Sequence, residues 1–204
     1  MTWSQETLSR AEEILGRYPE RRSAVMPLLY LAMREEGGLT TDGMRQVAEY
    51  TGLTPVQVES VASFYTMYKD AGVGKYVVSV CTSISCHLLG GDDVLAAIAD
   101  EADLAPGEID GDGVLFVERA ECIGACGGAP AVQVNYELVE GVEPDAGRRL
   151  CRWLIDDQPS VVGSDAMQAE FGGQRSFEWG PGESEGAAGP VPAFGPYGTA
   201  ESVS

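Results

Sequence analysis

Apolar residues in the first third of the chain recur every three or four positions, a period that predicts amphipathic helices. Ser23 is the expected cap of the second helix, and Thr54 and Gln57 are expected to form a capping box at the start of the fourth. The four expected helices run through Leu8 to Tyr18, from Ser23 to the Gly37-Gly38 pair, from about Asp42 to Thr51, and from Thr54-Pro55 to Tyr68. Residues 1–72 are therefore predicted to form a helical bundle.

The middle of the chain, residues 73–158, alternates between short β-branched runs and helical patterns. Strands are expected at Lys75–Val80, at Val114–Glu118 and at Ala131–Asn135, and helices through Val94–Ala102 and from Pro144 to Leu154. The order strand, helix, strand, strand, helix predicts a small layered α/β domain.

The last 46 residues have a different composition, with nine glycines and five prolines. Such a segment buries too little apolar surface to repay the entropy of ordering, so residues 159–204 are predicted to be an acidic tail that is extended or disordered. Four aromatic residues of this tail could contact a partner: Phe177, Trp179, Phe194 and Tyr197.

Charge and hydropathy exclude several kinds of partner. The chain has 13 basic and 32 acidic residues, a net charge of −19, which argues against nucleic acid and anionic membranes as partners. Residues 46–64 have the spacing of a helix-turn-helix, but in the expected helix from Pro55 to Tyr68 only Gln57 is suited to reading bases, so a packed helical corner is the better interpretation. Without an apolar run of about 20 residues or an export signal, we expect no membrane insertion and a cytosolic protein with reduced thiols.

Four of the five cysteines form two spaced pairs. Cys81 and Cys86 are separated by four residues, and Cys122 and Cys126 by three; each pair follows a predicted strand. Two loops at strand ends can bring four thiolates together, and loop glycines such as Gly128 are expected to point N–H groups at sulfur. The wide spacing favours a 2Fe–2S cluster. It leaves a structural zinc site open, and two disulfides are disfavoured by the reducing compartment.

The two remaining candidates for chemistry are Cys151 and His87. Cys151 lies on the apolar stripe of the last predicted helix and is expected to be a buried structural thiol. His87 follows Cys86 directly and would be a ligand in a Rieske-type centre, but four cysteines already complete a site. No catalytic residue is predicted.

The cysteine motifs, together with an upstream segment, resemble a known family. Val80-Cys81-Thr82-Ser83-Ile84-Ser85-Cys86, Glu121-Cys122-Ile123-Gly124-Ala125-Cys126-Gly127-Gly128-Ala129-Pro130 and Ala62-Ser63-Phe64-Tyr65-Thr66-Met67-Tyr68 are similar to segments of the thioredoxin-like 2Fe–2S subunit of bacterial NADH–quinone oxidoreductase, respiratory complex I. The resemblance covers about residues 5–157. Ser63, Gly72 and Ile123 stand where that family usually has Thr, Pro and Leu, and these changes leave the cysteines untouched.

The resemblance implies an α+β fold, in which an N-terminal helical bundle precedes a thioredoxin-like domain that carries the cluster. It implies that Cys81, Cys86, Cys122 and Cys126 hold one 2Fe–2S cluster. It further implies a partner subunit that binds FMN and NADH, within the peripheral arm on the cytoplasmic side of the inner membrane. The chain would then be a subunit of an oxidoreductase and would not oxidise NADH alone. Soluble NAD-linked hydrogenases and formate dehydrogenases use an equivalent subunit and remain an alternative, and a structural zinc-binding interaction module is a remote one.

Overall fold

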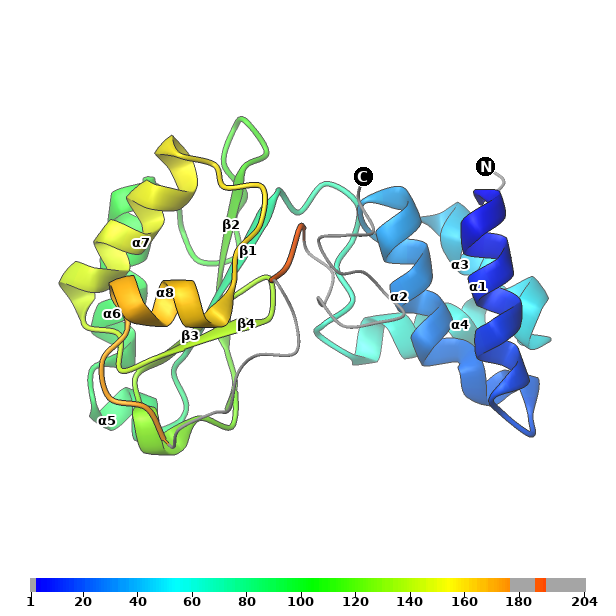
Figure 1. Ribbon diagram of the computed structural model, residues 1–204, viewed down its shortest axis with the longest axis horizontal. Coiled ribbons are helices and arrows are strands. Elements are labelled where there is room, and N and C mark those ends of the chain that lie inside the picture. The colour runs from blue at the N-terminus through cyan, green and yellow to red at the C-terminus, as the bar shows by residue number, and fades with distance from the viewer. Residues whose placement is uncertain (1–2, 177–185, 190–204) are drawn as a thin grey trace. The chain divides into compact units, whose positions relative to one another are not determined.

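The computed structural model describes residues 3–176 and 186–189, and these form two compact units (Figure 1). The described part of the first unit is residues 3–72, and the second contains residues 73–176 and 186–189. No helix in these ranges has the length and apolar composition needed to cross a bilayer.

The first unit is a bundle of four α-helices, as the apolar period predicts. It consists of α1 (Gln5–Gly16), the 3-10 turn η1 (Arg21–Ala24), α2 (Val25–Glu36), α3 (Thr41–Thr51) and α4 (Pro55–Phe64). Helix α2 packs against the other three and buries Leu28, Leu29 and Met33 completely. A hydrophobic helix surrounded by amphipathic ones gives this unit its own core.

The ends of these helices confirm one predicted cap and correct another. Thr54 and Gln57 form the predicted capping box: the Thr54 hydroxyl accepts from the Gln57 N–H, and the Gln57 side chain accepts from the Thr54 N–H. Ser23 does not cap α2. It lies inside η1, whose Arg22 carbonyl already accepts the N–H of Val25. Helix α4 ends at Phe64, four residues before the predicted end, because Tyr65 adopts extended backbone.

The second unit is built on a mixed four-stranded sheet with the order β2-β1-β3-β4. The strands are β1 (Tyr76–Cys81), β2 (Leu115–Ala120), β3 (Ala131–Val134) and β4 (Glu137–Glu140). Strand β1 is parallel to β2 and antiparallel to β3. Asn135 and Tyr136 form a two-residue turn between β3 and β4, both with positive φ, as the common tight hairpin turn requires.

Helices α5 (Ile84–Leu88), α6 (Gly91–Ala102), α7 (Pro144–Asp156) and α8 (Ser164–Phe171) complete this unit (Figure 1). Side chains of α6, α7 and α8 join those of the strands in one apolar core, with Ile98, Leu150 and Met167 almost fully buried. The three strands and two helices predicted for this domain are therefore present, and β4, α5 and α8 were not predicted.

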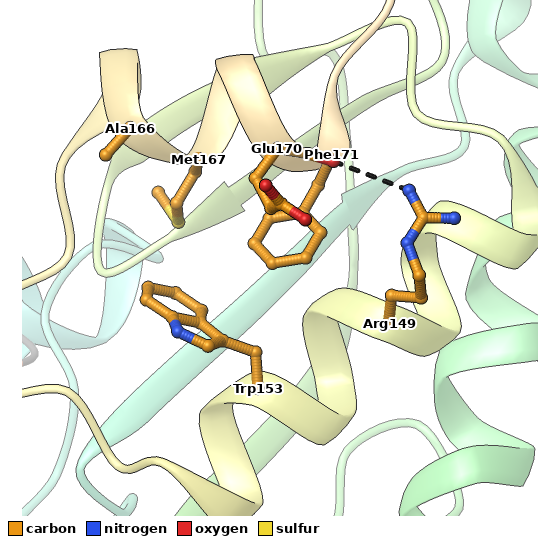
Figure 2. A pocket seen from close by; sticks show the side chains of 6 residues that line it. All are labelled: Arg149, Trp153, Ala166, Met167, Glu170 and Phe171. Atoms are coloured by element: carbon orange, nitrogen blue, oxygen red, sulfur yellow. Dashed lines mark hydrogen bonds between the residues drawn. The ribbon is translucent and has the colours of Figure 1, made fainter.

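Helix α8 corrects the interpretation of residues 159–204 as an extended or disordered tail. It packs against α7 and β4, and the Trp153 and Phe171 rings lie 5.5 Å apart. Figure 2 shows Trp153 of α7 facing Met167 and Phe171 across a surface pocket of about 420 Å³, while Arg149 donates to the Glu170 carbonyl at 3.4 Å. The composition was averaged over 46 residues, and the high glycine and proline content of the whole segment therefore gave no indication of this eight-residue helix. The predicted aromatic contacts at Phe177, Trp179, Phe194 and Tyr197 lie outside the described residues.

Candidate metal centre

The four paired cysteines lie where two neighbouring parallel strands end. Cys81 is the last residue of β1, and the register places it beside Ala120, the last residue of β2. Cys86 lies in α5, just beyond β1, while Cys122 and Cys126 follow β2. Because β1 and β2 are parallel and adjacent, both loops leave the sheet at the same edge. The fold thus brings together cysteines that are up to 45 residues apart in sequence.

These four cysteines line one pocket of about 220 Å³, together with Ser83, Ile84 and Ser85. The side chains of Cys81 and Cys86 are buried, those of Cys122 and Cys126 are exposed, and the last two sulfurs are 3.7 Å apart. All five cysteines of the chain are free thiols. The pocket therefore has an inner pair of thiols supported by the core and an outer pair at the surface.

The donor chemistry of this pocket fits an iron–sulfur cluster. Its lining offers four thiols and no carboxylate or imidazole, and Cys₄ is the usual ligand set of a 2Fe–2S cluster. Within residues 3–176 and 186–189, no three histidine, cysteine or carboxylate side chains are arranged to hold a single metal ion. The residues that could hold a cluster are the four cysteines that line this pocket.

Two of these four thiols, those of Cys86 and Cys126, have a raised pKa. Burial, with smaller effects from Cys81 and Cys126, raises the pKa of the Cys86 thiol to about 11. The hydrogen bond with Cys122 is the main cause of a raised pKa at Cys126. Because only thiolates ligate metal, assembly at neutral pH must release protons from this pocket.

The first cysteine loop is fixed by glycine and by an ion-pair network. A Cβ atom on Gly91, the first residue of α6, would lie 2.6 Å from the Cys81 carbonyl oxygen and 2.9 Å from that of Cys86. Nearby, Asp92 Oδ2 lies 2.5 Å from His87 Nδ1, and Asp92 Oδ1 accepts from Arg119 at 2.7 Å. These contacts tie α5, α6 and β2 together around the pocket. His87 faces Asp92 and does not line the pocket, and the hydrogen bond from His87 is the main cause of a lowered pKa at Asp92.

One prediction for the second loop is wrong. The Gly128 N–H donates to the Ala125 carbonyl at 3.2 Å and so does not point at a cysteine sulfur. Residues 126–128 form the 3-10 turn η2, and its internal hydrogen bond uses this donor. The glycine is needed for a different reason, since a Cβ there would lie 2.5 Å from a Glu140 carboxylate oxygen.

Cys151 is the predicted buried structural thiol, 1% exposed, with its sulfur 3.7 Å from the Ile98 carbonyl. Burial raises the pKa of this thiol to about 12, from an ordinary value of 9.0. The unfolded chain loses this proton as the pH passes 9, whereas the folded chain keeps it until about 12. The free energy of unfolding should therefore fall with rising pH in this range, by up to about 1.4 kcal/mol per pH unit.

Cys151→Ala tests this directly. Denaturant unfolding between about pH 9 and pH 11 should show a shallower loss of stability for the variant than for the wild type, because the variant has no thiol to titrate. The cavity lowers the stability of the variant at every pH and does not change the slope. Parallel slopes for the two proteins would contradict the assignment of this pH dependence to Cys151.

The second unit thus carries four thiols where two parallel strands of a mixed sheet end, the arrangement of a protein that can bind a metal centre. A family model described as "Thioredoxin-like [2Fe-2S] ferredoxin" matches residues 11–153, and the chain belongs to this family. Family membership supports a 2Fe–2S cluster as the group that the protein holds.

Several relatives are named as subunits of NADH-quinone oxidoreductases. The chain is 42% identical over 151 residues to the E subunit of NADH-quinone oxidoreductase from Mycobacterium tuberculosis, covering 74% of this chain and 60% of that protein. It is 37% identical over 159 residues to the E subunit of the Rickettsia conorii enzyme, covering 76% of this chain and 95% of that protein. Subunit 2 of the Thermus thermophilus enzyme is 39% identical over 128 residues, covering 62% of this chain and 71% of that protein. The chain thus spans only 60% of the length of its mycobacterial relatives.

A solved structure of an NAD+-reducing [NiFe]-hydrogenase in the air-oxidized state shares the fold. Its TM-score is 0.58 at 20% sequence identity, over 65% of this chain and 23% of the hydrogenase chain. At this level of identity the likeness concerns the fold alone.

Proposed function

We propose that this chain is the 2Fe–2S electron-transfer subunit of the NADH-oxidising module of an NADH–quinone oxidoreductase. In this proposal Cys81, Cys86, Cys122 and Cys126 hold the cluster. The observation that carries the proposal is the convergence of these four thiols in one pocket, in a chain 37–42% identical to the E subunits of that enzyme. The chain would lie in the peripheral arm of the complex, on the cytoplasmic side of the membrane.

The arrangement of the pocket explains how the residues serve one-electron chemistry. When bound, a 2Fe–2S cluster supplies one-electron transfer. Cys81 and Cys86 anchor the ligand set in the core and exclude water from its inner side, since both side chains are buried beside Ala125 and Ala131. Cys122 and Cys126 lie at the surface, where electrons can pass to a neighbouring protein without crossing this chain.

The surface around the pocket supports a permanent partner. Ile84, Leu88 and Leu89, on or just after α5, are 77%, 76% and 62% exposed, and Ile84 also lines the pocket. Three exposed aliphatic side chains within six residues are typical of a protein interface. We propose that they contact the subunit that binds FMN and NADH. In an NAD-linked hydrogenase or formate dehydrogenase the same surface would contact the equivalent flavoprotein, and membership of such an enzyme is the second candidate.

Purification of the tagged chain from its native host tests the proposal. The flavin-containing subunit should co-purify with the chain, and Leu88→Glu should weaken the complex about tenfold or more, because a charge would replace a central apolar contact. Val56→Glu is the matched control: Val56 is 72% exposed but lies on α4 in the other unit, and its replacement should leave affinity unchanged.

The identity of the captured subunits separates the candidates. Quinone-reducing subunits would support the complex I assignment, and hydrogenase or formate dehydrogenase subunits would replace it with the second candidate. A chain that contains zinc in place of iron, and captures no flavoprotein, would overturn both.

A further inference from the structure

One buried residue, Glu140, makes several hydrogen bonds with the C-terminal part of the second unit. Glu140 is the last residue of the edge strand β4 and is fully buried. Its backbone N–H donates to Gln168 Oε1 at 2.8 Å, and its carbonyl accepts from Gln168 Nε2 at 3.0 Å and from the Gly173 N–H at 2.8 Å. The Gln168 side chain thus makes the hydrogen bonds that a neighbouring strand would make.

The Glu140 side chain is held by Ser176, which follows α8 in the chain. Both the N–H and the hydroxyl of Ser176 donate to Glu140 Oε1, the former at 3.0 Å. A buried carboxylate needs such donors, since it has left water. We name residues 172–176, together with Gln168, the C-terminal clasp.

The clasp packs directly on the second cysteine loop. A Cβ on Gly128 would lie 2.5 Å from Glu140 Oε1 and 2.8 Å from the Gln174 carbonyl oxygen, and one on Gly127 would lie 3.1 Å from Ser176 Oγ. The Gly128 carbonyl accepts from the Gly141 N–H at 2.6 Å. Gly127 and Gly128 directly follow Cys126, so the contacts that seat this loop come from Glu140, Gly141 and the clasp.

We infer that Glu140 and Ser176 are positioning residues for the outer cysteine pair, an inference that rests on the proposed ligand set. The clasp lies beyond residue 153, where the match to the family model ends. In this chain, a segment outside that match supports the ligand loop. Hydrogen-bonded groups behind metal ligands fix the orientation of those ligands, and their removal costs about 10- to 100-fold in metal affinity in characterised sites.

A second serine–glutamate contact provides a matched control. At the other end of β4, both the N–H and the hydroxyl of Ser164 donate to Glu137 Oε2, at 3.0 and 2.6 Å. Glu137 pairs with Val134 next to the hairpin turn, whereas Glu140 pairs with Ala131 at the cysteine end of the sheet. Ser164→Ala therefore removes the same kind of contact from the same strand, away from the cysteine loop, together with the hydrogen bond that the Ser164 hydroxyl accepts from the Leu138 N–H at 2.9 Å.

The test compares cluster retention in the full-length holoprotein variants. Ser176→Ala and Glu140→Ala should lose iron to a chelator about tenfold faster than the wild type and should change the EPR spectrum of the reduced cluster. Glu140→Gln keeps the acceptor oxygen and should restore the wild-type spectrum. Ser164→Ala should lower thermal stability as Ser176→Ala does, with iron loss and spectrum unchanged.

The outcomes separate this inference from the proposed function. Equal iron loss in Ser164→Ala and Ser176→Ala, or an unchanged spectrum in Glu140→Ala, would overturn the positioning role. A wild-type protein without a 2Fe–2S signal would instead overturn the ligand assignment itself. If Glu140→Ala fails to fold, Ser176→Ala decides, since it leaves the carboxylate and the Ser176 N–H in place.

Discussion

Replacement of any one of Cys81, Cys86, Cys122 and Cys126 by serine should abolish or strongly alter the optical and EPR signals of the protein. Anaerobically purified wild-type protein should contain about two irons per chain, and the variants should contain much less. A serine hydroxyl is a poorer ligand for iron than a thiolate, because its proton is far harder to remove. The buried ligands should be the more sensitive, since a serine at Cys86 would also place a polar hydroxyl in the apolar cluster with Ala125 and Ala131.

Cys151→Ala is the control for these four variants. Cys151 is buried among the side chains of α6 and α7, and it does not line the pocket of the other four. Its removal should leave iron content and spectra unchanged. Stoichiometric zinc without iron in protein from an iron-replete host would contradict the cluster assignment, and full signals in all four serine variants would contradict the ligand assignment.

The convergence of the four cysteines could be predicted because the pattern that indicates it is local in sequence. The two cysteines of each pair lie within five residues of each other, and each pair lies at or just after the end of a β-branched run, at the same edge of the sheet. The bundle could be predicted for a similar reason, since the apolar positions of each helix recur over about three turns. In both cases the prediction rests on a short-range pattern of residue types, and the tertiary structure has the arrangement that this pattern predicts.

The elements that were missed depend on contacts distant in sequence. Strand β4 has only Leu138 and Val139 between two glutamates, and it forms because β3 offers it an antiparallel edge. Helix α5 has five residues, too few for a periodic pattern. Glu140 has the charge of a surface residue, and its burial depends on hydrogen bonds with residues such as Gln168 and Ser176, 28 and 36 residues later.

The polar contacts around the first cysteine loop could not be predicted from the sequence either. Arg119 and Asp92 are 27 residues apart and pair because β2 lies beside β1, whose end leads into α5 and α6. No spacing rule identifies such a pair. The sequence therefore predicts which residues could bind metal, while the contacts that hold the binding loops follow from the tertiary structure.

Gly91→Ala should damage both the fold and the metal centre. The added Cβ would lie 2.6 Å from the Cys81 carbonyl oxygen and 2.9 Å from that of Cys86, closer than these atoms can approach. The contacts are with backbone and cannot be relieved by rotating a side chain, so α6 must move away from the first cysteine loop. Such overpacking costs about 1–3 kcal/mol. Denaturant unfolding should show this loss, and the iron content of the purified variant should fall.

Gly16→Ala is the matched control. Gly16 is the last residue of α1, as Gly91 is the first of α6, so both are terminal glycines of a helix, and neither has a positive φ. A Cβ on Gly16 meets nothing within 4 Å. Alanine favours helix over glycine by up to about 1 kcal/mol, so this variant should be as stable as the wild type or slightly more stable, with its full complement of iron. The same substitution should thus have opposite signs at two helix ends, since only Gly91 lies against the carbonyls of two cysteines. A Gly91→Ala protein with wild-type stability and an unchanged cluster spectrum would show that the close approach of α6 is not what holds the first cysteine loop in place.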